Sequence, residues 1–393
     1  MIRRMGPALI GQGLNFLAML LPIFGQQTGQ LAYLMLPLAL ATVLARTSIL
    51  GYHSRYLTVA GPTRSTATAV SWSSLLAVTA VCGIVALALQ IPGSSSAGSV
   101  SAIAAWTALL VITNGTYLMA VAVVTQEQRM DVYSTARLIF GVVNVAATVV
   151  VVWFLPFHAG LIVVAAMNPL VGSLLILLRT ENRLLPQWWA SRRTMADADH
   201  RRYFADSSRA TGATFVSECG FQIQGFLTPF LGPYQEIWAV VVRLTGGFGS
   251  LAQQVIAPSL EAKIAAAIRE NNTATTAKWS RLCALGGVVL GIGCAVVQSG
   301  ALIFSLPDDD ALTPLVLAVT AVFCVASLST NLSVKIPLMK GLDRVFLTWS
   351  IGRLVPLVAL LLTTDGVLLG GIVTVQTLAA IVFLVMATRP SRI

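Results

Sequence analysis

Charged residues are scarce in this 393-residue chain: Asp, Glu, Lys and Arg together make up 10% of it. A water-soluble domain carries about a quarter of its residues as these four types. Hydrophobic residues make up 56% of the chain, and the mean hydropathy is +0.82. This composition excludes a soluble globular protein. Because a helix needs roughly 20 apolar residues to cross a ~30 Å hydrocarbon core, the chain has room for about a dozen spans and for little else.

Motifs that carry chemistry are lacking as well. No glycine loop is followed by Lys and Ser or Thr as nucleotide binding requires. The histidines, His53, His158 and His200, are scattered over connections on both sides of the predicted membrane, which does not suit a metal site. The cysteines lie in apolar runs, where a thiol is usually a small core residue. We therefore expect no cofactor, no metal and no enzymatic activity.

The chain does contain twelve long apolar runs, separated by polar residues, glycine or proline. They predict an all-α polytopic membrane protein with about 12 transmembrane helices in two six-helix bundles. The expected domains are residues 1–180, an N-terminal bundle, residues 181–208, a cytoplasmic linker, and residues 209–393, a C-terminal bundle. The predicted spans are 5–24, 30–52, 68–91, 102–124, 135–155, 158–179, 209–231, 237–258, 282–305, 312–334, 344–363 and 366–387.

Basic residues predict the orientation of these spans. Every Lys and Arg except Arg243 and Arg353 lies in or beside alternate connections, and the opposite connections carry only acidic charges, such as Glu236 and Asp365. The positive-inside rule then places the protein in the cell membrane with both termini cytoplasmic. The net charge of +10 is thus a signal of sidedness, and no nucleic-acid binding is expected. In the central linker, Trp188 and Trp189 among arginines are typical of a segment that contacts membrane lipids.

Three ionisable residues fall inside predicted spans, where such residues are functional candidates by default. Glu218 has two open interpretations: a structural ion pair with Arg243 or Arg353, or a titratable counter-ion site. Arg353 and Arg243 are candidates for a phosphate clamp in a water-filled cleft, since the guanidinium fork matches phosphate oxygens. Arg243 could equally lie near the outer headgroups.

Other polar residues complete the candidate binding set. Gln222 lies one helical turn after Glu218, and Gln12 and Asn15 lie in the first span, where they suit either sugar hydroxyls or helix-to-helix hydrogen bonds. Arg46 and Arg137 lie at inner ends of spans, where they either snorkel to water or form a basic cytoplasmic mouth. The spacings of Gly287 with Gly291 and of Gly366 with Gly370 predict close helix contacts.

With this layout, the chain resembles the polysaccharide flippases (Wzx-type) of the multidrug, oligosaccharidyl-lipid and polysaccharide exporter superfamily. Three stretches carry the resemblance beyond the layout: Thr125 to Arg137 between the fourth and fifth spans, Arg202 to Ser208 before the seventh, and Leu306-Pro307 after the ninth. The resemblance covers most of the chain. One departure is the small number of cations available to line a cavity.

The resemblance implies a V-shaped pair of bundles that moves a polyprenyl-diphosphate-linked oligosaccharide from the inner to the outer leaflet, by alternating access without ATP. Cationic residues would hold the diphosphate, and Arg353, Arg243, Arg137 and Arg46 could match that requirement. A glycan polymerase and glycosyltransferases are the expected partners. Two alternatives remain: a cation-coupled multidrug exporter of the same superfamily, and a polytopic glycan polymerase or ligase. The former needs an acidic site, and the latter a large outer loop.

Overall fold

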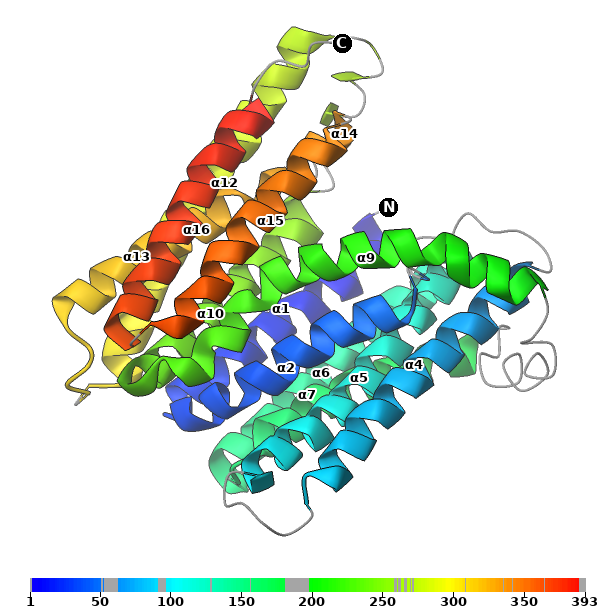
Figure 1. Ribbon diagram of the computed structural model, residues 1–393, viewed down its shortest axis with the longest axis horizontal. Helices are drawn as coiled ribbons and strands as arrows, with labels where there is room; N and C mark the ends of the chain where they lie inside the picture. The colour runs from blue at the N-terminus through cyan, green and yellow to red at the C-terminus, as the bar shows by residue number, and fades with distance from the viewer. Residues whose placement is uncertain are drawn as a thin grey trace. The chain divides into compact units, whose positions relative to one another are not determined.

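A computed structural model shows an all-helical chain, with no strand in the part that it describes (Figure 1). That part comprises residues 2–50, 52, 63–90, 97–127, 129–155, 157–180, 198–257, 272–307, 309–334, 336–340, 342–363 and 365–388, together with 260, 263, 264, 267, 268 and 270.

Twelve long helices match the twelve predicted spans in order. Their bounds are α1 Ile2–Phe24, α2 Thr28–Ser48, α4 Thr63–Ala88, α5 Ala97–Gln126, α6 Met130–Val149, α7 Gly160–Arg179, α9 Ala198–Leu227, α10 Gln235–Leu251, α12 Thr273–Ser305, α13 Pro314–Ser329, α15 Asp343–Ala359 and α16 Asp365–Thr388. Short π-helical turns extend α6 through Phe154 and α10 through Ile256. The expected fold class is confirmed.

Within the described ranges, ten helices are long and apolar enough to cross a membrane. The two that fall short are α9 and α10, which have 30 and 17 residues. The first third of α9 is polar, and its remainder carries Glu218, Gln222 and Gln224, so no part of this long helix is apolar enough. The helix α9 thus begins eleven residues before the predicted seventh span and takes in the end of the predicted linker. Trp188 and Trp189 lie outside the described residues.

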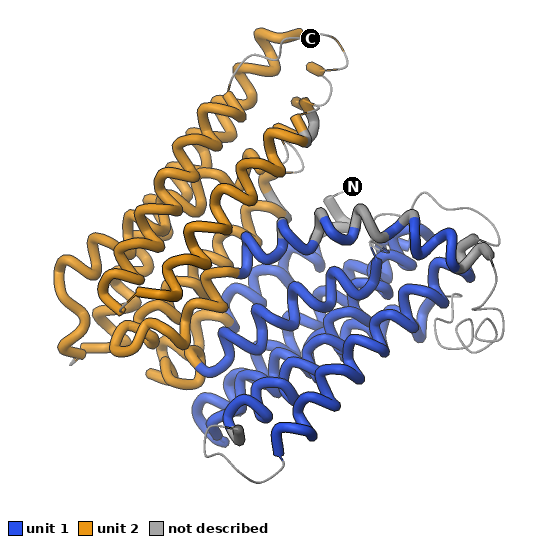
Figure 2. Tube along the Cα trace, viewed as in Figure 1, with its two compact units in different colours: residues 1–18, 33–222 blue, residues 19–32, 223–393 orange. Residues whose placement is uncertain are grey.

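The chain divides into two compact units, residues 1–18 with 33–222 and residues 19–32 with 223–393 (Figure 2). The division does not fall in the middle connection alone. The end of α1 and the start of α2 cluster with the second unit, while the rest of both helices clusters with the first. One polar contact lies within this part of the second unit: the Thr28 hydroxyl donates a hydrogen bond to the Glu236 carboxylate at the start of α10.

In the first unit, α5 packs against α4 and α7, and α6 packs against α7. Buried small side chains such as Ala120, Val124, Val132 and Ala136 form the core between these helices. The closest approach is between α1 and α6, at Gly11 and Gly141. A methyl group on Gly11 would lie 2.9 Å from the Leu138 Cα, so only glycine allows the two backbones to come this close.

In the second unit, α13 packs against α12 and α16, and α15 packs against α16. The predicted close contact at Gly287 and Gly291 is confirmed, because a methyl group on Gly291 would lie 2.7 Å from the Val325 Cα on α13. The same prediction for Gly366 and Gly370 is wrong. Both face open space, since the close contact of α16 uses Gly371, against the Leu360 side chain.

Candidate functional site

The predicted candidate residues are distributed over both units, so each unit is described by itself. Gln12, Asn15, Arg46, Arg137, Glu218 and Gln222 belong to the first unit, and Arg243 and Arg353 belong to the second.

Glu218 on α9 forms an ion pair with Arg46 at the end of α2. The Arg46 Nη1 lies 2.5 Å from the Glu218 Oε1, and the side chains are 45% and 11% exposed respectively. This is the one ion pair among the described residues. The sequence-based prediction that Glu218 pairs with Arg243 or Arg353 is therefore wrong. The reason is the register of α9, which brings Glu218 to the basic end of α2. The second oxygen, Oε2, is buried without a hydrogen-bond partner. Gln222, one turn further along α9, is half-buried.

A chain of asparagines links three helices of the first unit. Asn144 on α6 donates a hydrogen bond to the Asn15 Oδ1 on α1 at 2.9 Å, and its own Oδ1 accepts one from Asn168 on α7 at 2.5 Å. Asn15 and Asn168 are buried, and Gln12 is buried one turn before Asn15. Asn15 was expected to bind either sugar hydroxyls or another helix. In this unit it accepts a hydrogen bond from another helix. Sequence reasoning missed Asn168, which stands alone in an apolar run, directly before Pro169.

Arg137 lies near the start of α6, where an aromatic side chain accompanies it. Its Nε donates a hydrogen bond to the Tyr133 hydroxyl at 3.2 Å, and the guanidinium carbon lies 5.8 Å from the centre of the Tyr133 ring. The backbone of Arg137 is in contact with α1 at Gly11. Its side chain is half-buried. An arginine that only extends back to water would be more exposed.

In the second unit, Arg353 on α15 is 4% exposed. Its guanidinium carbon lies 4.8 Å from the centre of the Trp349 ring, one turn earlier on the same helix. Trp349 is fixed in turn, because its indole nitrogen donates a hydrogen bond to the Ala379 carbonyl and its ring packs 4.7 Å from that of Phe383. A cation over a fixed tryptophan face is attracted by the ring quadrupole.

Arg243 lies on α10 among fully buried neighbours, including Val240, Val241 and Leu244. Its Nε is buried and has no hydrogen-bond partner. In the described part of the chain no carboxylate lies within 4 Å of this guanidinium. A buried cation without a counter-ion is costly, so such a position suits a group that meets an anion supplied from outside the protein.

The second unit also holds a buried thiol cluster that sequence reasoning treated only as packing. The Cys294 Sγ lies 3.9 Å from the Cys324 Sγ, which is 3.1 Å from the Thr245 hydroxyl and in contact with Gln298. All four side chains are buried. Their contacts join α10, α12 and α13, which agrees with a packing role.

The charges of the candidate residues are therefore unequal. In the first unit the single carboxylate among them, Glu218, is already neutralised by Arg46. In the second unit the Arg243 Nε is buried without a hydrogen-bond partner, and such a guanidinium suits an anion.

No protein-family model matches the chain, and no curated protein matches it. Sixteen chains of solved structures do match. A MATE transporter from Vibrio cholerae is 14% identical with a TM-score of 0.53, covering 98% of this chain and 95% of its own. An inward-facing multidrug resistance MATE family transporter of the MOP superfamily is 14% identical with a TM-score of 0.52, covering 98% and 92%. A MOP superfamily transporter from Pyrococcus furiosus is 16% identical with a TM-score of 0.52, covering 98% and 94%. The chain therefore has the fold of MATE transporters of the MOP superfamily.

Proposed function

We propose that the protein is a membrane transporter of the flippase class, which moves a polyprenyl-diphosphate-linked oligosaccharide from the inner to the outer leaflet for surface polysaccharide synthesis. It would work by alternating access and without ATP. The membrane would be the cell membrane, with both termini on the cytoplasmic side, as the basic connections predict. The transporter fold supports the general class, and the charges of the candidate residues support the kind of cargo.

The observation that carries this proposal is the unequal charge of the candidate residues. Glu218 is neutralised by Arg46, while Arg353 is 4% exposed and the Arg243 Nε is buried without a hydrogen-bond partner. A diphosphate would supply a hydrogen-bond acceptor and a counter-charge to Arg243, and the guanidinium fork fits its oxygens. Asn15, Gln12 and Gln222 supply neutral hydrogen-bonding groups that suit sugar hydroxyls.

The energetics agree with outward movement. Carrying two negative charges outward across a membrane that is negative inside releases about 4–5 kcal/mol per 100 mV. No nucleotide is needed if cationic side chains shield the diphosphate on its way. Arg137 and Arg46, at helix ends on the basic side, would meet the headgroup first, and Arg243 and Arg353 would meet it deeper in the membrane.

The second candidate is a multidrug exporter, because two of the similar structures are described as multidrug resistance transporters. A cationic drug needs an acidic site, and the one candidate carboxylate here is paired with Arg46. A similar structure is described as having a binding pocket of reversed polarity that suggests a different function, so this fold accommodates both kinds of charge. The charge of the candidate residues favours the anionic cargo.

A cellular experiment distinguishes these candidates. The gene is deleted, the polyprenyl-diphosphate-linked sugars are extracted, and the leaflet that holds them is determined with a membrane-impermeant enzyme. We expect them to accumulate in the inner leaflet, with rescue by the wild type and by Lys263→Gln but not by Arg353→Ala. Glu218→Gln, tested beside them, asks whether the ion pair itself is needed. An unchanged pool with altered resistance to cationic compounds would instead identify a drug exporter, and accumulation in the outer leaflet a polymerase or ligase.

A further inference from the structure

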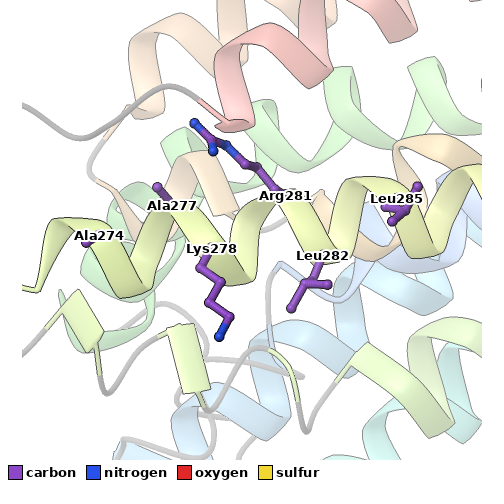
Figure 3. A pocket seen from close by; sticks show the side chains of 6 residues that line it. All are labelled: Ala274, Ala277, Lys278, Arg281, Leu282 and Leu285. Carbon is purple, nitrogen blue, oxygen red and sulfur yellow. The ribbon is translucent and has the colours of Figure 1, made fainter.

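Helix α12 has two faces of different chemistry. A hollow of about 490 Å³ lies along its open face, near the start of the helix. Figure 3 shows the two cations of this hollow, Lys278 and Arg281, extending to opposite sides of the helix, so they do not hold one ligand between them. Further along, the buried face carries Cys294 and Gln298, and there the polar side chains of three helices do converge.

The convergence is centred on Cys324 of α13. Its Sγ accepts a hydrogen bond from the Cys294 thiol at 3.9 Å, and its own thiol donates one to the Gln298 Oε1. The Thr245 hydroxyl of α10 lies 3.1 Å from the same sulfur. The two cysteines and Gln298 are 0% exposed, and Thr245 is 8% exposed. Packing accounts for this burial, but it does not require two sulfur and two oxygen donors to meet in one place.

The distance between the two sulfurs fits a single metal ion. With metal–sulfur bonds of about 2.3 Å, a separation of 3.9 Å corresponds to a sulfur–metal–sulfur angle of about 115°, near the tetrahedral value. The Gln298 carbonyl oxygen and the Thr245 hydroxyl oxygen both contact Cys324 and would supply a third and a fourth ligand. Two sulfurs and two oxygens from three helices therefore match the four-coordinate geometry of a thiophilic ion.

The depth of the two sulfurs decides the charge of such an ion. At about 1.5 Å per residue, Cys294 lies about 16 Å from the end of α12 at Ser305, and Cys324 lies about 15 Å from the start of α13 at Pro314. Both distances are about half of a ~30 Å hydrocarbon core, where a net charge is costly. A divalent ion with two thiolates is neutral, whereas a monovalent ion with two thiolates would leave a net negative charge.

Polar side chains lead from the sulfurs to the end of α12. Gln298 and Ser305 lie two turns apart on the same face of the helix, and both are buried. The Gln298 Nε2 and the Ser305 Oγ have no hydrogen-bond partner among the described residues. The connection that follows carries Asp309 and Asp310, whose carboxylates attract cations. A cation therefore has a polar route from this connection to the two sulfurs.

We propose that Cys294, Cys324, Gln298 and Thr245 form a binding site for a thiophilic divalent metal ion, with Zn²⁺ as the biological candidate. Binding would replace the two S–H hydrogens, which leave as two protons to water, so that both sulfurs bind as thiolates. The bound ion would tie α10 to α12 and α13 within the second unit. The site uses none of the candidate residues for transport, so it does not depend on what the transporter carries.

The test uses the purified full-length protein in detergent, with its thiols reduced, titrated with Cd²⁺ and followed by the ultraviolet thiolate-to-metal charge-transfer band. We expect one ion per protein, the release of two protons, and displacement of Cd²⁺ by Zn²⁺. Cys294→Ser and Cys324→Ser should each lower the affinity at least about hundredfold, and Gln298→Leu and Thr245→Val should each lower it about tenfold.

The matched control is Cys283→Ser, which removes another buried thiol of α12, in the core around Leu332, and should leave the affinity unchanged. X-ray absorption by the Zn²⁺-loaded wild type needs no variant, and it should show two sulfur and two oxygen neighbours. Absence of the charge-transfer band in the reduced wild type would overturn the proposal. So would equal affinity of Cys294→Ser and the wild type, or a metal environment without sulfur.

Discussion

At the scale of single residues, the charges inside the helices are arranged in two ways. Glu218 has its own cation in Arg46, which is half in contact with solvent, while Arg353 is held over an aromatic ring. The first arrangement neutralises a charge within the protein, and the second places a cation against an aromatic face. The hydropathy pattern revealed the depth of these residues. It could not reveal their partners, because these depend on the rotation and register of α2 and α9.

The two partners of the ion pair should respond unequally to substitution. Arg46→Gln leaves the Glu218 carboxylate buried and unpaired, at a cost of about 1–3 kcal/mol, whereas Glu218→Gln leaves an arginine that is 45% exposed and that water can solvate, at a cost below about 1 kcal/mol. The free energy of unfolding in detergent, measured for both single variants and for the double variant, checks this order. The double variant should recover most of the loss caused by Arg46→Gln. Equal costs for the two single variants would contradict the account.

In the hydrogen-bonded chain of asparagines, substitution of the central residue, Asn144, should cost more stability than substitution of a residue at either end. Asn144→Leu removes two hydrogen bonds and leaves the Asn15 oxygen and the Asn168 amide without their partner, at a cost of about 1–2 kcal/mol. Asn15→Leu removes one bond and should cost about half as much. Thermal unfolding of the two variants in the same detergent gives the comparison. The prediction fails if Asn15→Leu is the more damaging of the two.

At the scale of helices, the twelve spans could be predicted because each requires a long apolar run, and such runs are directly visible in the sequence. The start of α9 could not be predicted in this way. Its first third is polar, and hydropathy alone assigns such residues to a connection. The glycine contacts were predictable in part. Gly287 with Gly291 and Gly366 with Gly370 have the same spacing, but only the first pair faces another helix.

The contact of α12 with α13 gives a direct test of close packing. Gly291→Ala places a methyl group 2.7 Å from the Val325 Cα, so the helices must separate, at a cost of about 1–3 kcal/mol. The matched control is Gly293→Ala on the same helix, where nothing lies within 4 Å and the change should be neutral or stabilising by up to about 1 kcal/mol. Unfolding temperatures of the two variants in detergent check the contrast. A Gly291→Ala protein as stable as Gly293→Ala would show that this contact tolerates a side chain.

At the scale of the whole molecule, the chain combines a transporter fold with candidate residues whose charge suits an anion. The fold could be anticipated from the number and order of spans, whereas the sidedness indicated by the basic connections stays a prediction. The proposed cargo rests on the charge of a few residues: the one candidate acid is paired with Arg46, and the Arg243 Nε is buried without a hydrogen-bond partner. This balance is the central claim, and it predicts transport of a lipid-linked anion driven by membrane potential.

The most direct measurement reconstitutes the purified protein in vesicles that carry a fluorescent polyprenyl-diphosphate-linked sugar, with a membrane potential set by a potassium gradient and valinomycin. The account predicts that headgroups appear on the positive face, faster as the potential increases, and at least tenfold slower for Arg353→Gln and Arg243→Gln than for Lys263→Gln. Transport of a cationic drug, with no movement of the diphosphate-linked sugar in the wild type, would contradict it.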